Sequence, residues 1–104
     1  MQASYAASFS REMGCTEAEW LRWLPAAIGE HAWQREHASM RVCIAGGDQM
    51  QGTLQLTWSV GSIRKIALVA LPRLQVDFQF EGLDDAQRYT FMRRFDLYMQ
   101  RGGG

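Results

Sequence analysis

The clearest pattern in the sequence is the alternation in Leu74-Gln-Val-Asp-Phe-Gln-Phe-Glu81, where every second residue is apolar. A period of two places successive side chains on opposite faces of a β-strand, so this stretch predicts a strand with one buried and one solvated face. The stretch Thr53-Leu-Gln-Leu-Thr-Trp-Ser-Val60 has the same pattern, and an earlier strand starts with Met40, Val42 and Ile44. Strands of this kind are typical of an antiparallel sheet that is covered on one side only.

Short turns connect these strands. Gly46-Gly47-Asp48 separates the first two, and Gly61-Ser62 follows the second. Residues 63–71 are apolar on both faces after Arg64 and Lys65, which predicts a strand in the middle of the sheet or under a cover. Pro72 ends that strand because proline cannot donate to a central ladder. Connections this short imply antiparallel pairing, since a parallel crossover needs roughly a dozen residues or more.

A capping box marks the first helix. Thr16 is followed three residues later by Glu19, a pair that satisfies the free backbone donors of a helix N-terminus. The apolar stripe that follows consists of Trp20, Trp23 and Leu24. Pro25 is expected to end this helix or to open a second short turn, and Gly29 is a natural stop.

A second helix is predicted near the C-terminus, over residues 85–100. Asp84 is its expected N-cap, with Gln87 three residues later, and the glycines at 102–104 end it. At 100° per residue one broad face of this helix is apolar. That face carries Phe91, Met92, Phe95, Tyr98 and Met99.

These elements predict a single α+β domain over residues 1–104. We expect a two-layer sandwich in which an antiparallel meander sheet of three to five strands is covered on one face by the N- and C-terminal helices. Residues 1–15 have weak periodicity and predict a loose N-terminal arm or a short turn of helix. Residues 30–39 fit either a helix or an irregular first strand, and residues 102–104 are expected to form a flexible tail.

The charge balance excludes some classes of function. Among 104 residues, 11 basic side chains face 11 acidic ones, so the chain lacks the positive field of a non-specific nucleic-acid binder. No stretch approaches the roughly 18 apolar residues of a membrane span, and the N-terminus lacks the features of a signal peptide. We therefore expect a cytoplasmic protein without a nucleic-acid or membrane partner.

The residues that carry metal or nucleophilic chemistry form no known motif. Cys15, His31, His37 and Cys43 match no zinc-binding spacing. The sequence contains no Gly-x-Ser-x-Gly elbow and no phosphate-binding loop. We therefore expect no metal and no cofactor, and the sequence favours a non-catalytic protein over an enzyme.

Arg88 is the residue that fits the predicted core least well. It projects onto the apolar face of the second helix, where an unpaired guanidinium would be very costly. It can extend out at the sheet edge, pair internally with Asp77, Glu81 or Asp85, or point into a pocket for an anionic ligand. With Arg73, it is our candidate for binding a small anionic molecule between helix and sheet.

A second set of residues is typical of protein interfaces. The set consists of Trp20, Trp23, Trp33, Arg93, Arg94 and Arg101. Tryptophan and arginine are common interface anchors, so the preferred function is a non-catalytic binding or regulatory module that contacts a protein or a second copy of itself. A two-fold homodimer is the commonest such assembly. Aromatic residues are not interleaved with the arginines on their helix face, which argues against base stacking.

The C-terminal stretch Gln100-Arg-Gly-Gly-Gly104 resembles the exposed end of ubiquitin-like and sulfur-carrier proteins. The resemblance implies a carrier whose terminal glycine carboxylate is activated by an enzyme. It covers only these last residues. In those families a β-strand leads into the tail, whereas a helix precedes it here. The carrier is therefore a third hypothesis beside the protein-binding module and the anion-binding pocket.

Overall fold

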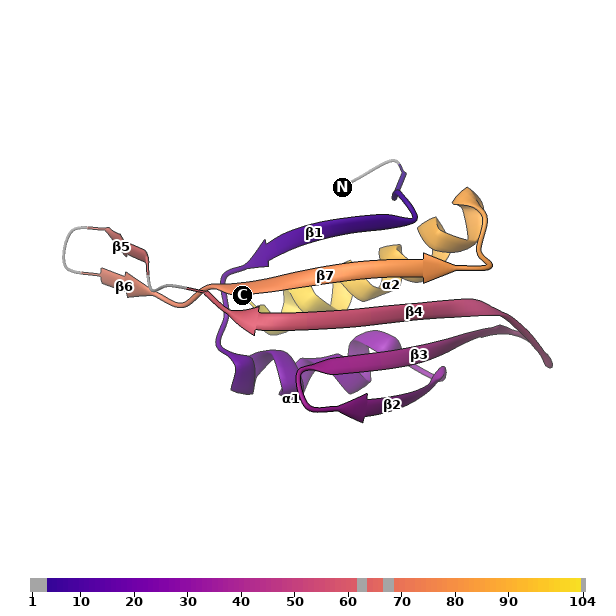
Figure 1. Ribbon diagram of the computed structural model, residues 1–104, viewed down its shortest axis with the longest axis horizontal. Helices are drawn as coiled ribbons and strands as arrows, with labels where there is room; N and C mark the ends of the chain where they lie inside the picture. The colour runs from indigo at the N-terminus through magenta and orange to yellow at the C-terminus, as the bar shows by residue number, and fades with distance from the viewer. Residues whose placement is uncertain (1–3, 62–63, 67–68, 104) are drawn as a thin grey trace.

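The computed structural model describes residues 4–61, 64–66 and 69–103, with residues 64–66, 69 and 101–103 as backbone alone. A five-stranded antiparallel sheet forms one layer and two helices form the other (Figure 1). In spatial order the strands of this sheet are β1 (Ser8–Met13), β7 (Leu74–Glu81), β4 (Gln49–Val60), β3 (Ser39–Gly46) and β2 (Ala32–Glu36). The predicted α+β class, with terminal helices on one face, is confirmed.

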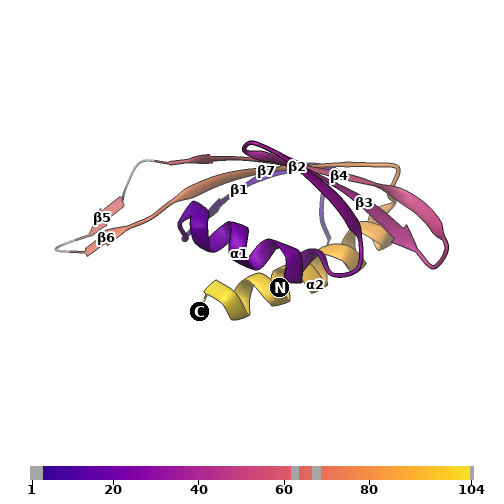
Figure 2. The same cartoon turned by 90° about the horizontal axis from the view of Figure 1, so that it is seen from below.

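Both helices cover the same face of the sheet (Figure 2). They are α1 (Glu17–Ile28) and α2 (Asp85–Gly103). Each begins at the predicted capping box. Thr16 Oγ1 accepts from the backbone N–H of Glu19 at 3.1 Å, and the Glu19 carboxylate accepts from the N–H of Thr16 at 3.0 Å. The two corresponding bonds between Asp84 and Gln87 are 2.8 Å long.

The helix ends differ from the predicted ones in two places. Helix α1 continues through Pro25 to its cap at Gly29. Pro25 lies on the exposed side of the helix, where water can reach the carbonyl group that the missing N–H leaves unbonded. Helix α2 extends to Gly103, so the predicted tail at 102–104 is wrong for its first two residues. Gly104 lies outside the described residues.

The core lies between the two layers and comes from the predicted periodic positions. Rings from three elements meet there, since Trp20 of α1 packs edge-on against Trp58 of β4 at 5.8 Å and Phe95 of α2 at 6.0 Å between ring centroids. The largest fully buried side chains are Trp20, Leu24, Ile28, Val42, Leu54, Leu56, Leu74, Val76, Phe78, Met92 and Phe95.

The loose N-terminal arm expected over residues 1–15 is wrong for residues 8–13, and residues 1–3 lie outside the described residues. Strand β1 pairs antiparallel with β7 from Ser8 to Met13. Phe9 and Met13 pack against the core, and the ring of Phe9 stacks on Phe78 at 4.7 Å. The pattern hides this strand because Arg11 occupies the position between them on the core side. The ambiguous residues 30–39 contain strand β2.

The single strand expected over residues 63–71 is also wrong. Strands β5 (Arg64–Ile66) and β6 (Val69–Leu71) pair only with each other and form a hairpin that projects from one end of the main sheet (Figures 1 and 2). Strands β4 and β7 pair directly up to Val60 and Leu74, so no place remains between them for another strand. Ser62, in the predicted turn, lies outside the described residues.

Candidate interaction surfaces

The hairpin of β5 and β6, called the arm below, is the first candidate surface. Its pairing sets Lys65 opposite Ala70 and Ile66 opposite Val69. Among the described residues, the outer edge of each arm strand has no pairing partner. At the base of the arm the side chains of Val60 and Leu71 are 70% and 40% exposed. Two apolar side chains are therefore exposed to solvent at the base of the arm.

The two edges of the arm differ in charge. Strand β5 carries Arg64 and Lys65, whereas β6 consists of Val69, Ala70 and Leu71. Charged residues on an edge strand protect it from pairing with another chain. The edge of β6 lacks this protection.

The second candidate surface is a groove of about 400 Å³ on the outer side of α2. Its six lining residues form two rows on α2, with a spacing of four residues within each row. We call this surface the α2 groove. The rows are Tyr89, Arg93 and Leu97, and Thr90, Arg94 and Tyr98. Within the described part of the chain neither arginine has an ion-pair partner. Leu97 is 42% exposed.

The groove brings tyrosines beside arginines, contrary to our expectation that aromatic residues are not interleaved there. The guanidinium of Arg94 lies over the ring of Tyr98, 4.6 Å from its centroid, because residues four apart meet on a helix surface. The ring of Tyr89 lies 6.4 Å from that of Tyr5. Both rings are thus engaged within the chain, which still disfavours base stacking.

The side chain of Arg94 packs closely against Gly29 at the C-terminal end of helix α1. Gly29 caps α1 with φ of 74°, and a Cβ atom there would lie 2.7 Å from Nε of Arg94. Nearby, Nδ1 of His31 accepts from the backbone N–H of Ala45 at 3.1 Å. Burial, and then the charge of Arg94, lowers the pKa of His31 below its usual value. Glycine at position 29 therefore lets the arginine approach the α1 terminus.

Arg88 is bonded within the chain. Its Nε donates to the carbonyl oxygen of Tyr5 at 2.8 Å, its Nη1 donates to that of Leu83 at 2.7 Å, and its Nη2 pairs with Asp85. This geometry corresponds to internal pairing, one of the three outcomes weighed for this residue. The groove does not include Arg88.

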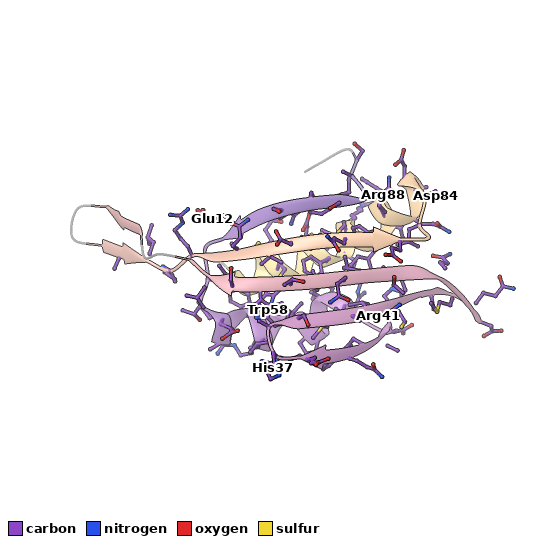
Figure 3. All side chains as sticks on the ribbon, in the orientation of Figure 1. Glu12, His37, Arg41, Trp58, Asp84 and Arg88 are labelled. Carbon is purple, nitrogen blue, oxygen red and sulfur yellow. The ribbon has the colours of Figure 1, made fainter. Side chains whose placement is uncertain are left out.

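Arg73, the other candidate for an anionic ligand, pairs with Glu12 of β1. Figure 3 shows Glu12 near the arm and Arg88 at the opposite end of the sheet. The two candidate ligand residues therefore do not form a common site.

The tryptophans expected on a partner surface are divided between core and surface. Trp20 is fully buried, so its place on a partner surface is wrong, because α1 turns this side chain toward the sheet. Trp23 is half-buried against the core, and Trp33, on edge strand β2, is 42% exposed. Arg93 and Arg94 are exposed, and the side chain of Arg101 lies outside the described residues.

Sequence reasoning missed a polar cluster between β1 and α2. The guanidinium of Arg11 donates two hydrogen bonds to the Asp96 carboxylate, and the Tyr5 hydroxyl donates to the same carboxylate at 2.6 Å. Burial, and then Asp96, raises the pKa of Tyr5 to about 12. These hydrogen bonds link the β1 side of the sheet to α2, so the cluster holds the two layers together. The signal for this cluster in the sequence is that Arg11 lies on the same face of the strand as the apolar residues Phe9 and Met13.

Neither a metal site nor a membrane helix is found in the described ranges. They contain no group of three or more His, Cys, Asp and Glu side chains that could hold a metal ion. Cys15 is a buried free thiol whose pKa is raised by burial and then by Glu19, and Cys43 is half-buried. None of the described helices is long and apolar enough to span a membrane.

Comparison with known proteins finds no matching family model, no matching curated protein and no matching solved structure. Function therefore has to be inferred from the arm and the α2 groove themselves.

Proposed function

We propose that this protein is a non-catalytic binding module that associates with a second copy of itself through the arm. The observation that carries the proposal is the uncharged edge of β6, which lies outside the main sheet. A hairpin of two strands is only marginally stable in water. Exposed apolar segments mark sites of protein contact. Pairing with a second copy would cover the edge of β6 and the apolar residues at the base of the arm.

The proposed contact pairs β6 of one copy with β6 of the other, antiparallel about a two-fold axis. Such an axis uses the same surface on both copies, so the interface is self-complementary. With the centre of the three-residue strand on the axis, Ala70 lies opposite Ala70 of the second copy. Val69 then lies opposite Leu71.

Charge favours this edge over the alternatives. Pairing β5 with β5 would set Arg64 and Lys65 near the same cations of the second copy, and like charges in opposing strands are destabilising. The edge strands of the main sheet also carry charged residues, which protect them from pairing. These residues are Arg11 and Glu12 on β1, and Arg35 and Glu36 on β2.

The proposed contact is small. The three residues of β6 together with the exposed Val60 bury less than the roughly 800 Å² per partner of a standard interface. We therefore expect a weak dimer whose population depends on protein concentration. Such a module would respond to its own abundance, and we expect it to do so in the cytoplasm.

The other two functions have less support. An anion-binding pocket at Arg88 is disfavoured because its guanidinium already bonds two carbonyl groups and Asp85. The carrier hypothesis requires an extended tail, whereas α2 continues through Gly103. Neither observation favours a second function over the binding module.

Sedimentation velocity over a concentration series tests the self-association. We expect the wild-type protein to shift toward a dimer as its concentration rises, and Leu71→Lys to remain monomeric. Met50→Lys is the matched control, because Met50 is a 64% exposed apolar side chain at the other end of β4. A wild-type protein that stays monomeric up to its solubility limit, or equal effects of both variants, would contradict the proposal.

A further inference from the structure

We infer that the α2 groove binds an acidic segment of a partner protein. In this complex, carboxylates of the segment pair with Arg93 and Arg94, and an apolar side chain of the segment lies on Leu97. This site is separate from the arm, since all six of its lining residues belong to α2. It adds a second, different partner to the proposed module.

The charge of the groove points to a carboxylate ligand. Arg11, Arg73 and Arg88 each pair with a carboxylate of the chain, whereas Arg93 and Arg94 are adjacent and have no such partner in the described part. The planar guanidinium binds a carboxylate through two parallel hydrogen bonds. The other described arginines outside ion pairs are single residues on α1, β2 and β3, namely Arg22, Arg35 and Arg41.

The groove is partly preorganised for binding. Arg94 is positioned by the ring of Tyr98 on one side and by the close approach of Gly29 on the other. A side chain that is already held loses less conformational freedom when it binds a ligand. Leu97 supplies exposed apolar surface between the polar groups. Arginine and tyrosine around such a surface are typical of interface hot spots.

The shape of the groove favours a protein segment over a small anion. Small-molecule sites bury most of their ligand in a concave pocket. The α2 groove instead lies along the outer face of a single helix, where two rows at a spacing of four residues match the repeat of a second helix. Nucleic acid is disfavoured because the chain carries no net charge and both tyrosine rings are engaged.

Fluorescence anisotropy of a labelled synthetic peptide tests the site on the full chain. The probe is a helical peptide with Glu and Leu at a spacing of three and four residues, and the matched probe has Gln in place of Glu. We expect saturable binding of the Glu peptide that weakens with added salt. Arg93→Gln and Arg94→Gln should each weaken it by about tenfold. Arg41→Gln, an exposed arginine labelled on the sheet in Figure 3, should not.

Three results would overturn the inference. The first is absence of saturable binding, or equal binding of the Gln peptide. The second is equal affinity of the Arg93→Gln, Arg94→Gln and Arg41→Gln proteins for the Glu peptide. The third is binding of citrate with the affinity of the peptide, which would assign the groove to small acids. Repeating the titration with Leu71→Lys distinguishes the two proposals. This variant is expected to lose self-association, whereas its affinity for the Glu peptide should equal that of the wild type.

Discussion

Arg11 and Asp96 join the first strand to the last helix through two parallel hydrogen bonds. Nη1 of Arg11 lies 2.5 Å from Oδ1 of Asp96, and Nη2 lies 3.0 Å from Oδ2. The two side chains are 21% and 29% exposed. The guanidinium also lies 5.4 Å from the ring centroids of Phe9 and Phe78. The β1 edge of the sandwich is therefore closed by a charged pair over aromatic rings.

Asp96→Ala is expected to lower the free energy of unfolding by about 2 kcal/mol. It removes the carboxylate that accepts hydrogen bonds from the Arg11 guanidinium and the Tyr5 hydroxyl. The expected loss is below the roughly 3–5 kcal/mol of a fully buried pair because both side chains retain some water contact. Urea denaturation measures the change.

The control for this variant is Asp77→Ala. Asp77 accepts from Ser10 at 2.5 Å on the exposed face of the same pair of strands. Its loss is expected to change the free energy of unfolding by less than about 0.5 kcal/mol. Equal losses for the two aspartates would show that the Arg11 and Asp96 pair has no special structural role.

His31 is expected to make stability fall in mild acid. Burial, and then Arg94, lowers the pKa of His31 in the folded protein, and Glu30 opposes this effect. The folded state therefore prefers the neutral ring. The contribution of His31 is complete above its unfolded pKa of about 6.5 and is lost as pH falls from there through the lowered folded value.

The measurement is the free energy of unfolding against pH for the wild type and for His31→Gln. We expect the difference between wild type and His31→Gln to change as pH falls below about 6.5. A constant difference for His31→Gln would contradict the assigned direction of its pKa.

Gly29→Ala is expected to destabilise the protein and to displace Arg94. The backbone at this cap has φ of 74°, and the added methyl group would collide with the arginine. A non-glycine residue in such a conformation costs about 1–3 kcal/mol. Gly14→Ala is the control, since a Cβ there meets nothing within 4 Å and its backbone needs no glycine. Thermal unfolding of both variants distinguishes the two sites, and equal shifts would contradict the tight approach of Arg94 to Gly29.

The parts of the fold that the sequence predicts are those set by local interactions. The capping boxes at Thr16 and Asp84 each involve residues only three apart, and both form. The alternation through Phe78 and Phe80 places both rings in the core because a strand has a strict period of two. Each of these signals lies within one element, so no knowledge of distant pairing is needed.

The parts that it misses depend on contacts between distant residues. Strand β1 escapes prediction because Arg11 is polar at a core-side position, and its partner Asp96 lies 85 residues later in the chain. The arm is misassigned because an apolar sequence fits a central strand as well as an outlying hairpin. The direct pairing of Val60 with Leu74 excludes the central place, and a pattern of hydrophobicity does not record which strands pair.

The same distinction between local interactions and contacts of distant residues applies to the candidate surfaces. Arg93 and Arg94 are predicted on an exposed helix face by helical spacing alone, and both are exposed. The approach of Gly29 to Arg94 depends on how α1 packs against α2, so sequence reasoning did not find it. Trp20 is assigned to the surface from its residue type, although its place beside Leu24 on the apolar stripe of α1 is the better guide.

A cysteine at position 70 is a direct probe of the proposed pairing of β6 with β6. In antiparallel strands, directly opposed Cα atoms are about 4.5–5.5 Å apart, a separation that a disulfide can span. The experiment compares Ala70→Cys with Ala26→Cys, an exposed control on α1, both in a Cys43→Ser background under mild oxidation. We expect a covalent dimer on non-reducing electrophoresis that forms much faster for Ala70→Cys than for Ala26→Cys. Equal, slow cross-linking of the two variants would contradict the pairing of β6 with β6.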